Sequence, residues 1–165
     1  MKGTALAIAI SAAAAVAAVA AFPPGATVIW NRTESAPKGI YLITKSEIKT
    51  GDWAALSGES ETAKWIAENG YLRTDWPIIK RVAASEGDEI CRTEEEVFIN
   101  KTLTAIALDA DSARKKLPRW KGCITLQADQ VFLLNNHPRS LDGRYFGAEN
   151  RKDLLGRARL LFRVD

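Results

Sequence analysis

Short β-prone segments separated by turn residues run through most of this chain, and they constrain its fold more than any other feature. Each is rich in apolar, β-branched or aromatic residues, which is typical of strands. The predicted strands are Ala26–Trp30, Gly39–Thr44, Trp53–Leu56, Ile78–Ala84, Glu96–Ile99, Thr102–Leu108, Val131–Leu134 and Leu160–Val164. Between two of them, Asn100-Lys101 predicts a two-residue hairpin turn.

Two other segments have the pattern of short helices. The first, Ser60–Asn69, begins with a capping hydroxyl and ends at Gly70, and the second, Asp109–Lys116, is charged and ends before Pro118. The chain has 165 residues, of which 47% are hydrophobic, which suits one globular domain or two small subdomains that share a core. We therefore predict a mainly β, antiparallel fold with small helical insertions, preceded by one N-terminal apolar helix.

Residues 4–22 form an uncharged run of 19 residues, which is long enough to span a bilayer as a helix. Eleven of these residues are alanine, and Ala18-Val19-Ala20 resembles a small-residue cleavage site. A cleaved export signal and a retained membrane anchor are both open. Lys2 is the only charge before the run and favours the cytoplasmic side. We therefore predict an export signal or anchor over residues 1–22 and a periplasmic domain over residues 23–165.

The charge balance and the cysteines limit the partners. The net charge is +3, and acidic residues are interleaved with basic ones. Without a dense stripe of basic residues we expect no nucleic acid partner, although a membrane surface is compatible with this charge. In an oxidising compartment, Cys91 and Cys123 predict a disulfide, and two free buried thiols are the alternative. Two cysteines and His137 at unrelated spacing build no zinc site, so no metal or other cofactor is predicted.

Lys80 lies on the apolar face of a predicted strand. Side chains alternate across a strand, so Lys80 shares its face with Ile78 and Val82. A lysine in this position either extends to the edge or is desolvated. Desolvation disfavours the ammonium form, and a neutral lysine can act as a general base.

Two other segments hold candidate polar residues. In Ser35-Ala36-Pro37-Lys38-Gly39, the proline extends the residue before it and Gly39 allows a tight turn, so Ser35 is held at the start of a strand. A serine in such a loop is ordinarily a turn former. The segment 135–147 contains His137, Ser140, Asp142 and Arg144.

Taken in this order, the three segments resemble the type I signal peptidases, and most closely the TraF pilin-maturation peptidases of conjugation systems. The sequence Lys80-Arg81-Val82 with Gly87-Asp88 matches the lysine box of that family. Its last box is matched by Ser140, Asp142, Arg144 and Gly147, while Gly143 replaces a second serine. The Ser35 segment is similar to the S-x-P-x-G form of the TraF branch.

The resemblance implies a serine endopeptidase with a Ser/Lys dyad, in which Ser35 attacks the scissile carbonyl and Lys80 takes the proton. It implies that Thr33 donates to the oxyanion, that Ser140 orients the lysine amine, and that Asp142 and Arg144 brace the site. The implied substrate is an exported, membrane-bound precursor, which in the TraF branch is a conjugative pilin. Either water or the N-terminal amine of the precursor can resolve the acyl-enzyme, and the second route gives a cyclic pilin.

Three alternatives stay open. The chain could be a general type I signal peptidase with a wider range of substrates. It could be a non-catalytic exported β module that binds a partner in a secretion or pilus complex. A Ser-His-Asp arrangement of Ser35, His137 and Asp142 is the third alternative, but it leaves the lysine box without a role.

Overall fold

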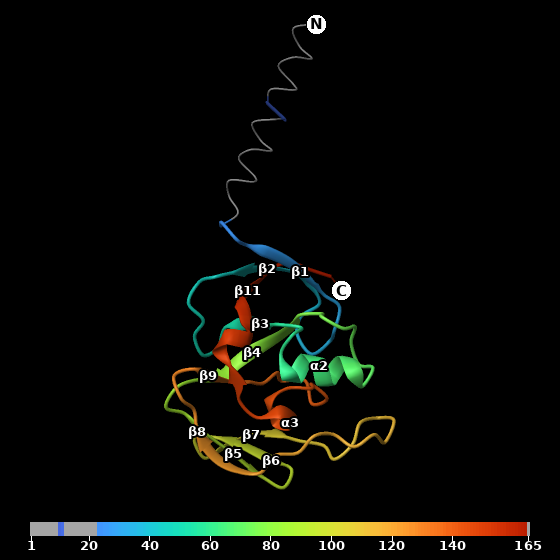
Figure 1. Ribbon diagram of the computed structural model, residues 1–165, viewed down its shortest axis with the longest axis vertical. Coiled ribbons are helices and arrows are strands. Elements are labelled where there is room, and N and C mark those ends of the chain that lie inside the picture. The colour runs from blue at the N-terminus through green and yellow to red at the C-terminus, as the bar shows by residue number, and fades with distance from the viewer. Residues whose placement is uncertain (1–9, 12–22, 165) are drawn as a thin grey trace, which may run out of the picture.

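The computed structural model describes residues 10–11 and 23–164, which form two antiparallel β-sheets and a few short helices (Figure 1). The larger sheet has seven strands. In order of pairing they are β1 (Thr27–Asn31), β2 (Gly39–Thr44), β11 (Leu154–Arg163), β3 (Trp53–Leu56), β4 (Ile78–Ala84), β9 (Gln130–Leu133) and β10 (Glu149–Asn150). The last strand of the chain, β11, therefore joins the pair β1–β2 to the rest of the sheet.

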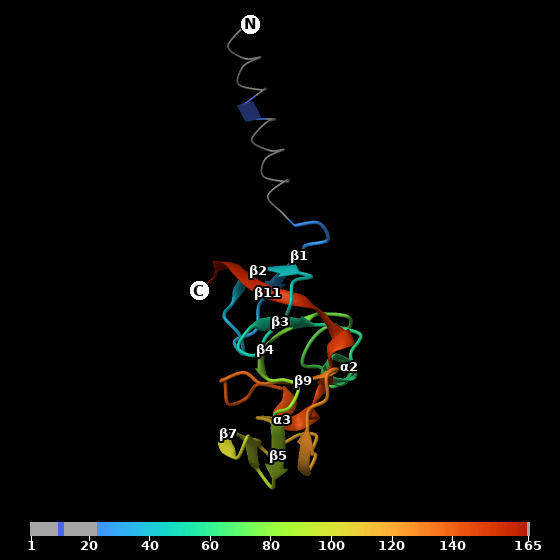
Figure 2. The ribbon, with the colours of Figure 1, turned by 90° about the vertical axis from the view of Figure 1, so that its left-hand side faces the viewer.

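The smaller sheet lies at the end of the molecule opposite β1 and β2 (Figures 1 and 2). Its four strands pair in the order β7 (Thr102–Ile106), β6 (Glu96–Ile99), β5 (Glu89–Thr93) and β8 (Gly122–Thr125). Asn100 and Lys101 have φ values of 48° and 66°, as the predicted two-residue turn requires. Cys91 of β5 pairs in register with Cys123 of β8, and the two form the predicted disulfide.

The helices are α2 (Glu61–Glu68), α3 (Gly143–Phe146) and the 3-10 turn η1 (Arg151–Asp153). The first matches its prediction, because Ser60 Oγ accepts a hydrogen bond from the backbone of Ala63 at 3.2 Å and caps the helix. Ala63 and Ile66 lie on its buried face and pack in one apolar cluster with Ile78 and Val82 of β4. This packing holds α2 against the strand that carries Lys80.

The predicted helix over Asp109–Lys116 is wrong. Asp111 Oδ1 accepts hydrogen bonds from the backbone N–H groups of Ala113 and Lys115, both at 2.8 Å. These bonds replace the helical pattern, and Arg114 has a φ of 64°, which a right-handed helix excludes. The segment is instead a loop that is closed by a bridge between Ala110 and Lys116.

The predicted mainly β, antiparallel fold is confirmed. Three of its strands, β5, β8 and the two-residue β10, are additional to the prediction, and β11 begins at Leu154 rather than Leu160. The predicted helix over residues 4–22 lies outside the described residues except for Ile10 and Ser11. Within residues 10–11 and 23–164, no helix has the length and apolar character needed to cross a membrane.

Candidate active site

The loop between β1 and β2 holds Ser35 in a fixed place, and Asn31 at the end of β1 organises this loop. Asn31 Nδ2 lies within hydrogen-bond distance of the carbonyls of Thr33, Ala36 and Pro37, at 3.1, 3.2 and 3.1 Å. Its Oδ1 accepts from the backbone N–H of Thr33 at 3.2 Å. Both Asn31 and Ala36 are buried. One buried amide thus fixes the backbone on both sides of Ser35.

The side chain of Thr33 lies next to that of Ser35. Their hydroxyl oxygens are 3.5 Å apart, and Thr33 Oγ1 donates a hydrogen bond to Asn31 Oδ1 at 2.8 Å. The proton of Thr33 is therefore directed at Asn31. Its predicted role as a donor to the oxyanion requires that bond to be exchanged for one to the substrate.

Lys80 is buried in the middle of β4, opposite Ala54 of β3. Only 3% of its surface is exposed, and Nζ donates a hydrogen bond to Ser140 Oγ at 2.9 Å. Burial lowers the pKa of Lys80 from 10.5 to about 8. The charge of Asp142 opposes this shift, that of Arg144 adds to it, and that of Glu149 opposes it. The structure thus places Lys80 and Ser140 together, as the resemblance implies.

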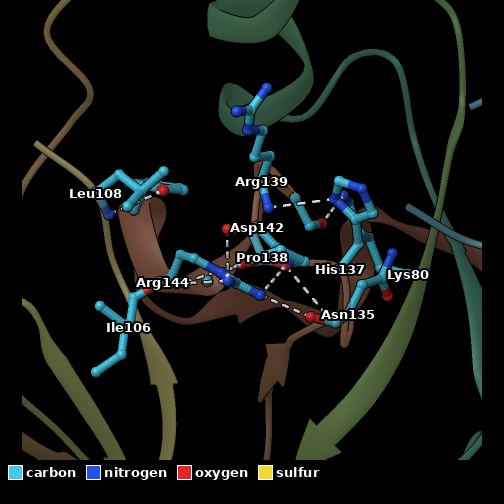
Figure 3. Close-up of polar contacts among 12 residues, drawn as sticks. Lys80, Ile106, Leu108, Asn135, His137, Pro138, Arg139, Asp142 and Arg144 are labelled. Atoms are coloured by element: carbon cyan, nitrogen blue, oxygen red, sulfur yellow. Dashed lines mark hydrogen bonds and ion pairs between the residues drawn. The ribbon is translucent and has the colours of Figure 1, made fainter. Parts of the chain in front are cut away.

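Asp142 and Arg144 form a buried ion pair that shapes the loop containing Ser140 (Figure 3). Arg144 Nε donates to Asp142 Oδ1 at 2.8 Å, and Asp142 Oδ2 accepts from the backbone N–H of Asn135 at 3.0 Å. The guanidinium of Arg144 also donates to the carbonyls of Asn135 and Pro138, at 2.6 and 3.1 Å. These bonds connect the two ends of the loop that carries Ser140.

Two residues that the sequence analysis missed hold α3, which follows the loop of Ser140: Arg92 lies on β5 of the smaller sheet, and Trp120 precedes β8. Arg92 of β5 is 2% exposed, and its Nη1 donates to the carbonyl of Arg144 at 2.7 Å. Trp120 Nε1 donates to the carbonyl of Gly143 at 2.9 Å. Both carbonyls belong to α3, and that of Gly143 also accepts a hydrogen bond from the backbone N–H of Gly147 at 2.9 Å. No local signal in the sequence marked Arg92, because an arginine in a strand is usually exposed.

Ser35 and Lys80 face a common cleft of about 430 Å3. Ile66, Ile78, Ser140 and Leu141 also line this cleft. Four charged residues line it as well, Arg32, Arg139 and the ion pair of Lys38 with Glu34 at 2.8 Å. In this structure the hydrogen bond of Ser35 Oγ goes to Thr33, whereas that of Lys80 Nζ goes to Ser140. The cleft therefore brings together the two residues predicted as nucleophile and base, without a direct bond between them.

His137 lies at the rim of the same cleft, and its Nδ1 accepts from the backbone N–H of Arg139 at 3.2 Å (Figure 3). The carboxylate of Asp142 is directed at Arg144 and the backbone of Asn135. In a Ser-His-Asp arrangement the acid would orient the histidine ring, and Asp142 has other partners here. Within residues 10–11 and 23–164, no three His, Cys, Asp or Glu side chains are grouped so that they could hold a metal ion.

The chain is similar in sequence to two plasmid and conjugal transfer proteins and in structure to a signal peptidase. The plasmid transfer protein TraF of Escherichia coli is 31% identical over 155 residues, which cover 87% of this chain and 86% of the relative. The conjugal transfer protein TraF of Agrobacterium fabrum strain C58 is 28% identical over 147 residues, with 82% of each chain covered. A signal peptidase I of Enterococcus faecalis matches in structure with a TM-score of 0.40 and 18% identity, covering 72% of this chain and 100% of the other.

The family model described as signal peptidase, peptidase S26, matches residues 1–163 of this chain. This match spans the serine loop, the strand of Lys80 and the loop of Ser140. It confirms the predicted resemblance: the chain belongs to the signal peptidase family S26, a family of serine peptidases.

Proposed function

We propose that this chain is an endopeptidase in which Ser35 is the nucleophile and Lys80 the general base, and that it processes an exported, membrane-bound pilin precursor. The observation that carries the proposal is the burial of Lys80 in the cleft that also contains Ser35. Burial lowers the pKa of Lys80 to about 8. A lysine that loses its proton near neutrality can activate a serine hydroxyl. The names of the TraF relatives support a role in conjugation.

In the proposed reaction, Ser35 Oγ attacks the scissile carbonyl and its proton moves to Lys80 Nζ. The tetrahedral intermediate collapses to an acyl-enzyme, and Lys80 returns the proton to the departing amine. A second nucleophile then attacks the ester and releases Ser35. Water gives a linear product, whereas the N-terminal amine of the same precursor gives a cyclic one, with the proton again passing through Lys80. Ser140 keeps the lysine amine in place in both halves of the reaction.

We further propose that the domain works in the periplasm, at the membrane surface, with residues 4–22 as the export signal or anchor. The disulfide between Cys91 and Cys123 supports an oxidising compartment. Pairing of β1, β2 and β11 aligns Trp30, Ile40 and Phe162 in one row across the sheet. Trp30 and Phe162 are 52% and 69% exposed, and an exposed aromatic row suits the interfacial layer of a membrane.

The test is the intact mass of the major pilin in cells that carry the wild-type protein or Ser35→Ala. We expect the variant to leave the full-length precursor, and the wild-type product to be one water lighter than the linear chain if it is cyclised. Ser46→Ala is the matched control, because Ser46 is exposed and bonds Thr44, away from the cleft. A pilin of unchanged mass would reject the pilin substrate. Other exported proteins left as precursors would then indicate a general signal peptidase, and no precursor at all a binding module.

A further inference from the structure

A second cavity adjoins the catalytic cleft. It has a volume of about 300 Å3, and apolar side chains form most of its wall, among them Leu108, Leu117 and Tyr145. Tyr71, Arg139 and Leu141 line both this cavity and the cleft. Leu141 directly follows Ser140, which holds the amine of Lys80. The second cavity is therefore one residue removed from the proposed catalytic machinery.

Hydrogen bonds hold the walls of the second cavity in place. Tyr71 OH donates to Asp111 Oδ2 at 2.6 Å, which ties the segment after α2 to the loop over residues 107–117. Tyr145 OH accepts from the backbone N–H of Leu108 at 3.1 Å, which ties the same loop to α3. Asp111 Oδ1 also holds two backbone N–H groups of its own loop. The cavity is thus preformed, and an occupant loses little free energy in ordering it.

The shape and chemistry of the second cavity suit a side chain of a peptide. Its volume is at the small end of the range of roughly 300–1,000 Å3 for ligand pockets, so it has room for a side chain rather than a folded element. Arg139 stands where the two cavities meet, and its side chain points away from Asp142 and Arg144 (Figure 3). Its guanidinium can therefore donate to a carbonyl of a chain that passes from one cavity to the other.

We propose that the second cavity is a substrate subsite, which binds an apolar side chain of the precursor outside the residues that flank the scissile bond. This inference rests on the proposed function and adds a specificity determinant to it. A peptide that lies in the cleft has its next residues beside Tyr71 and Leu141, where the second cavity opens. An apolar side chain that fills such a pocket changes kcat/KM by about ten- to two-hundredfold.

The test compares two synthetic peptides that contain the cleavage site of the precursor. The short peptide has about six residues, or roughly 20 Å in extended form, and the long peptide has about twelve. Leu108→Trp is the informative variant, because Leu108 lines the second cavity and is 40% exposed, so a larger side chain can enter the cavity without disturbing the core. Leu103→Trp is the matched control, because Leu103 is 49% exposed on β7 and lines neither cavity.

We expect Leu108→Trp to lower kcat/KM for the long peptide at least tenfold, through KM, and to leave the short peptide unchanged. Replacing one apolar residue of the long peptide by alanine should give the same loss with the wild-type enzyme, and no further loss with Leu108→Trp. The subsite would be overturned if Leu108→Trp affected both peptides equally, or if its loss added to the loss from the alanine replacement in the long peptide. In either case, cleavage of the short peptide would still support the peptidase activity. If the wild-type enzyme cleaves neither peptide, the proposed function itself fails and the subsite loses its premise.

Discussion

The burial of Lys80 predicts the pH dependence of cleavage. Its pKa falls from 10.5 to about 8 because the ammonium is desolvated, and a pKa change of one unit corresponds to about 1.4 kcal/mol. The neutral amine is therefore present at pH 7 in about a tenth of the molecules, against roughly one in 3,000 for an ordinary lysine. Burial thus increases the population of the neutral amine of Lys80 about 300-fold at pH 7.

The measurement is kcat/KM on a fluorogenic peptide between pH 5.5 and 10, at constant ionic strength, with Ser35→Ala as the blank. We expect kcat/KM to rise about tenfold per pH unit and to level off near pH 8, because this ratio reports the base of the free enzyme. A midpoint near 6.5, far below the pKa of Lys80, would reject Lys80 as the base. A midpoint near 10.5 would refute the argument that burial activates Lys80.

The variant Glu149→Gln tests the electrostatic part of this account with the same pH profile of kcat/KM. The buried carboxylate of Glu149 raises the pKa of Lys80, so its removal should move the midpoint to lower pH. Glutamine keeps an oxygen that can accept the hydrogen bond from Thr62, so the fold should be little affected. A midpoint that moved to higher pH would contradict the electrostatic account of the site.

Three further predictions concern stability and positioning. Because the folded-state pKa of Lys80 lies below its ordinary value, the desolvated ammonium destabilises the fold below pH 8 and ceases to do so as the pH rises to 10.5. Lys80→Met should therefore abolish cleavage yet raise the free energy of unfolding in urea by about 1–3 kcal/mol at pH 7, with a smaller gain at pH 10; a loss at pH 7 would contradict this. Arg92→Met leaves the buried carbonyl of Arg144 without its donor, so it should lower stability by about 1–3 kcal/mol and lower kcat more than it raises KM, with partial rescue by Arg92→Lys. Replacing Cys91 and Cys123 by alanine opens a loop of 32 residues and should cost about 3–4 kcal/mol in urea unfolding, whereas an unchanged midpoint would show that the disulfide does not constrain the unfolded chain.

Segments with a local pattern could be predicted from the sequence. The strands Gly39–Thr44, Trp53–Leu56, Ile78–Ala84 and Glu96–Ile99 have the predicted bounds, because apolar residues and flanking turns define them. Two strands of the smaller sheet escaped prediction for a physical reason. In β5 the inward position that follows Ile90 is filled by Arg92, and all four residues of β8 are exposed. Neither strand has the alternation of apolar and polar residues that marks a half-buried strand.

The remaining errors of the sequence-based prediction concern residues whose roles depend on contacts with distant parts of the chain. β11 begins at Leu154, six residues before its predicted start. The prediction placed the start too late because Gly156 interrupts the β-prone pattern. Glycine is needed there, since a side chain would collide with the carbonyl of Thr44. In the site, the sequence pointed to Ser35, Lys80 and Ser140 through the resemblance to a family. The buried amide of Asn31 could not be found in this way, since an asparagine that ends a strand usually belongs to a turn.

The place of β11 in the sheet also decides when the two halves of the candidate site can come together. The loop with Ser35 joins β1 to β2, while Lys80 lies on β4, and β11 is the strand between these two halves. β11 follows all the other described strands in the sequence, so export from the N-terminus, as we propose, would bring it across after them. Until residues 154–163 arrive, the two halves of the sheet have no shared strand, and the serine has no lysine beside it. If the domain is exported and cleaves precursors as we propose, it can become active only after β11 has crossed the membrane and joined the sheet.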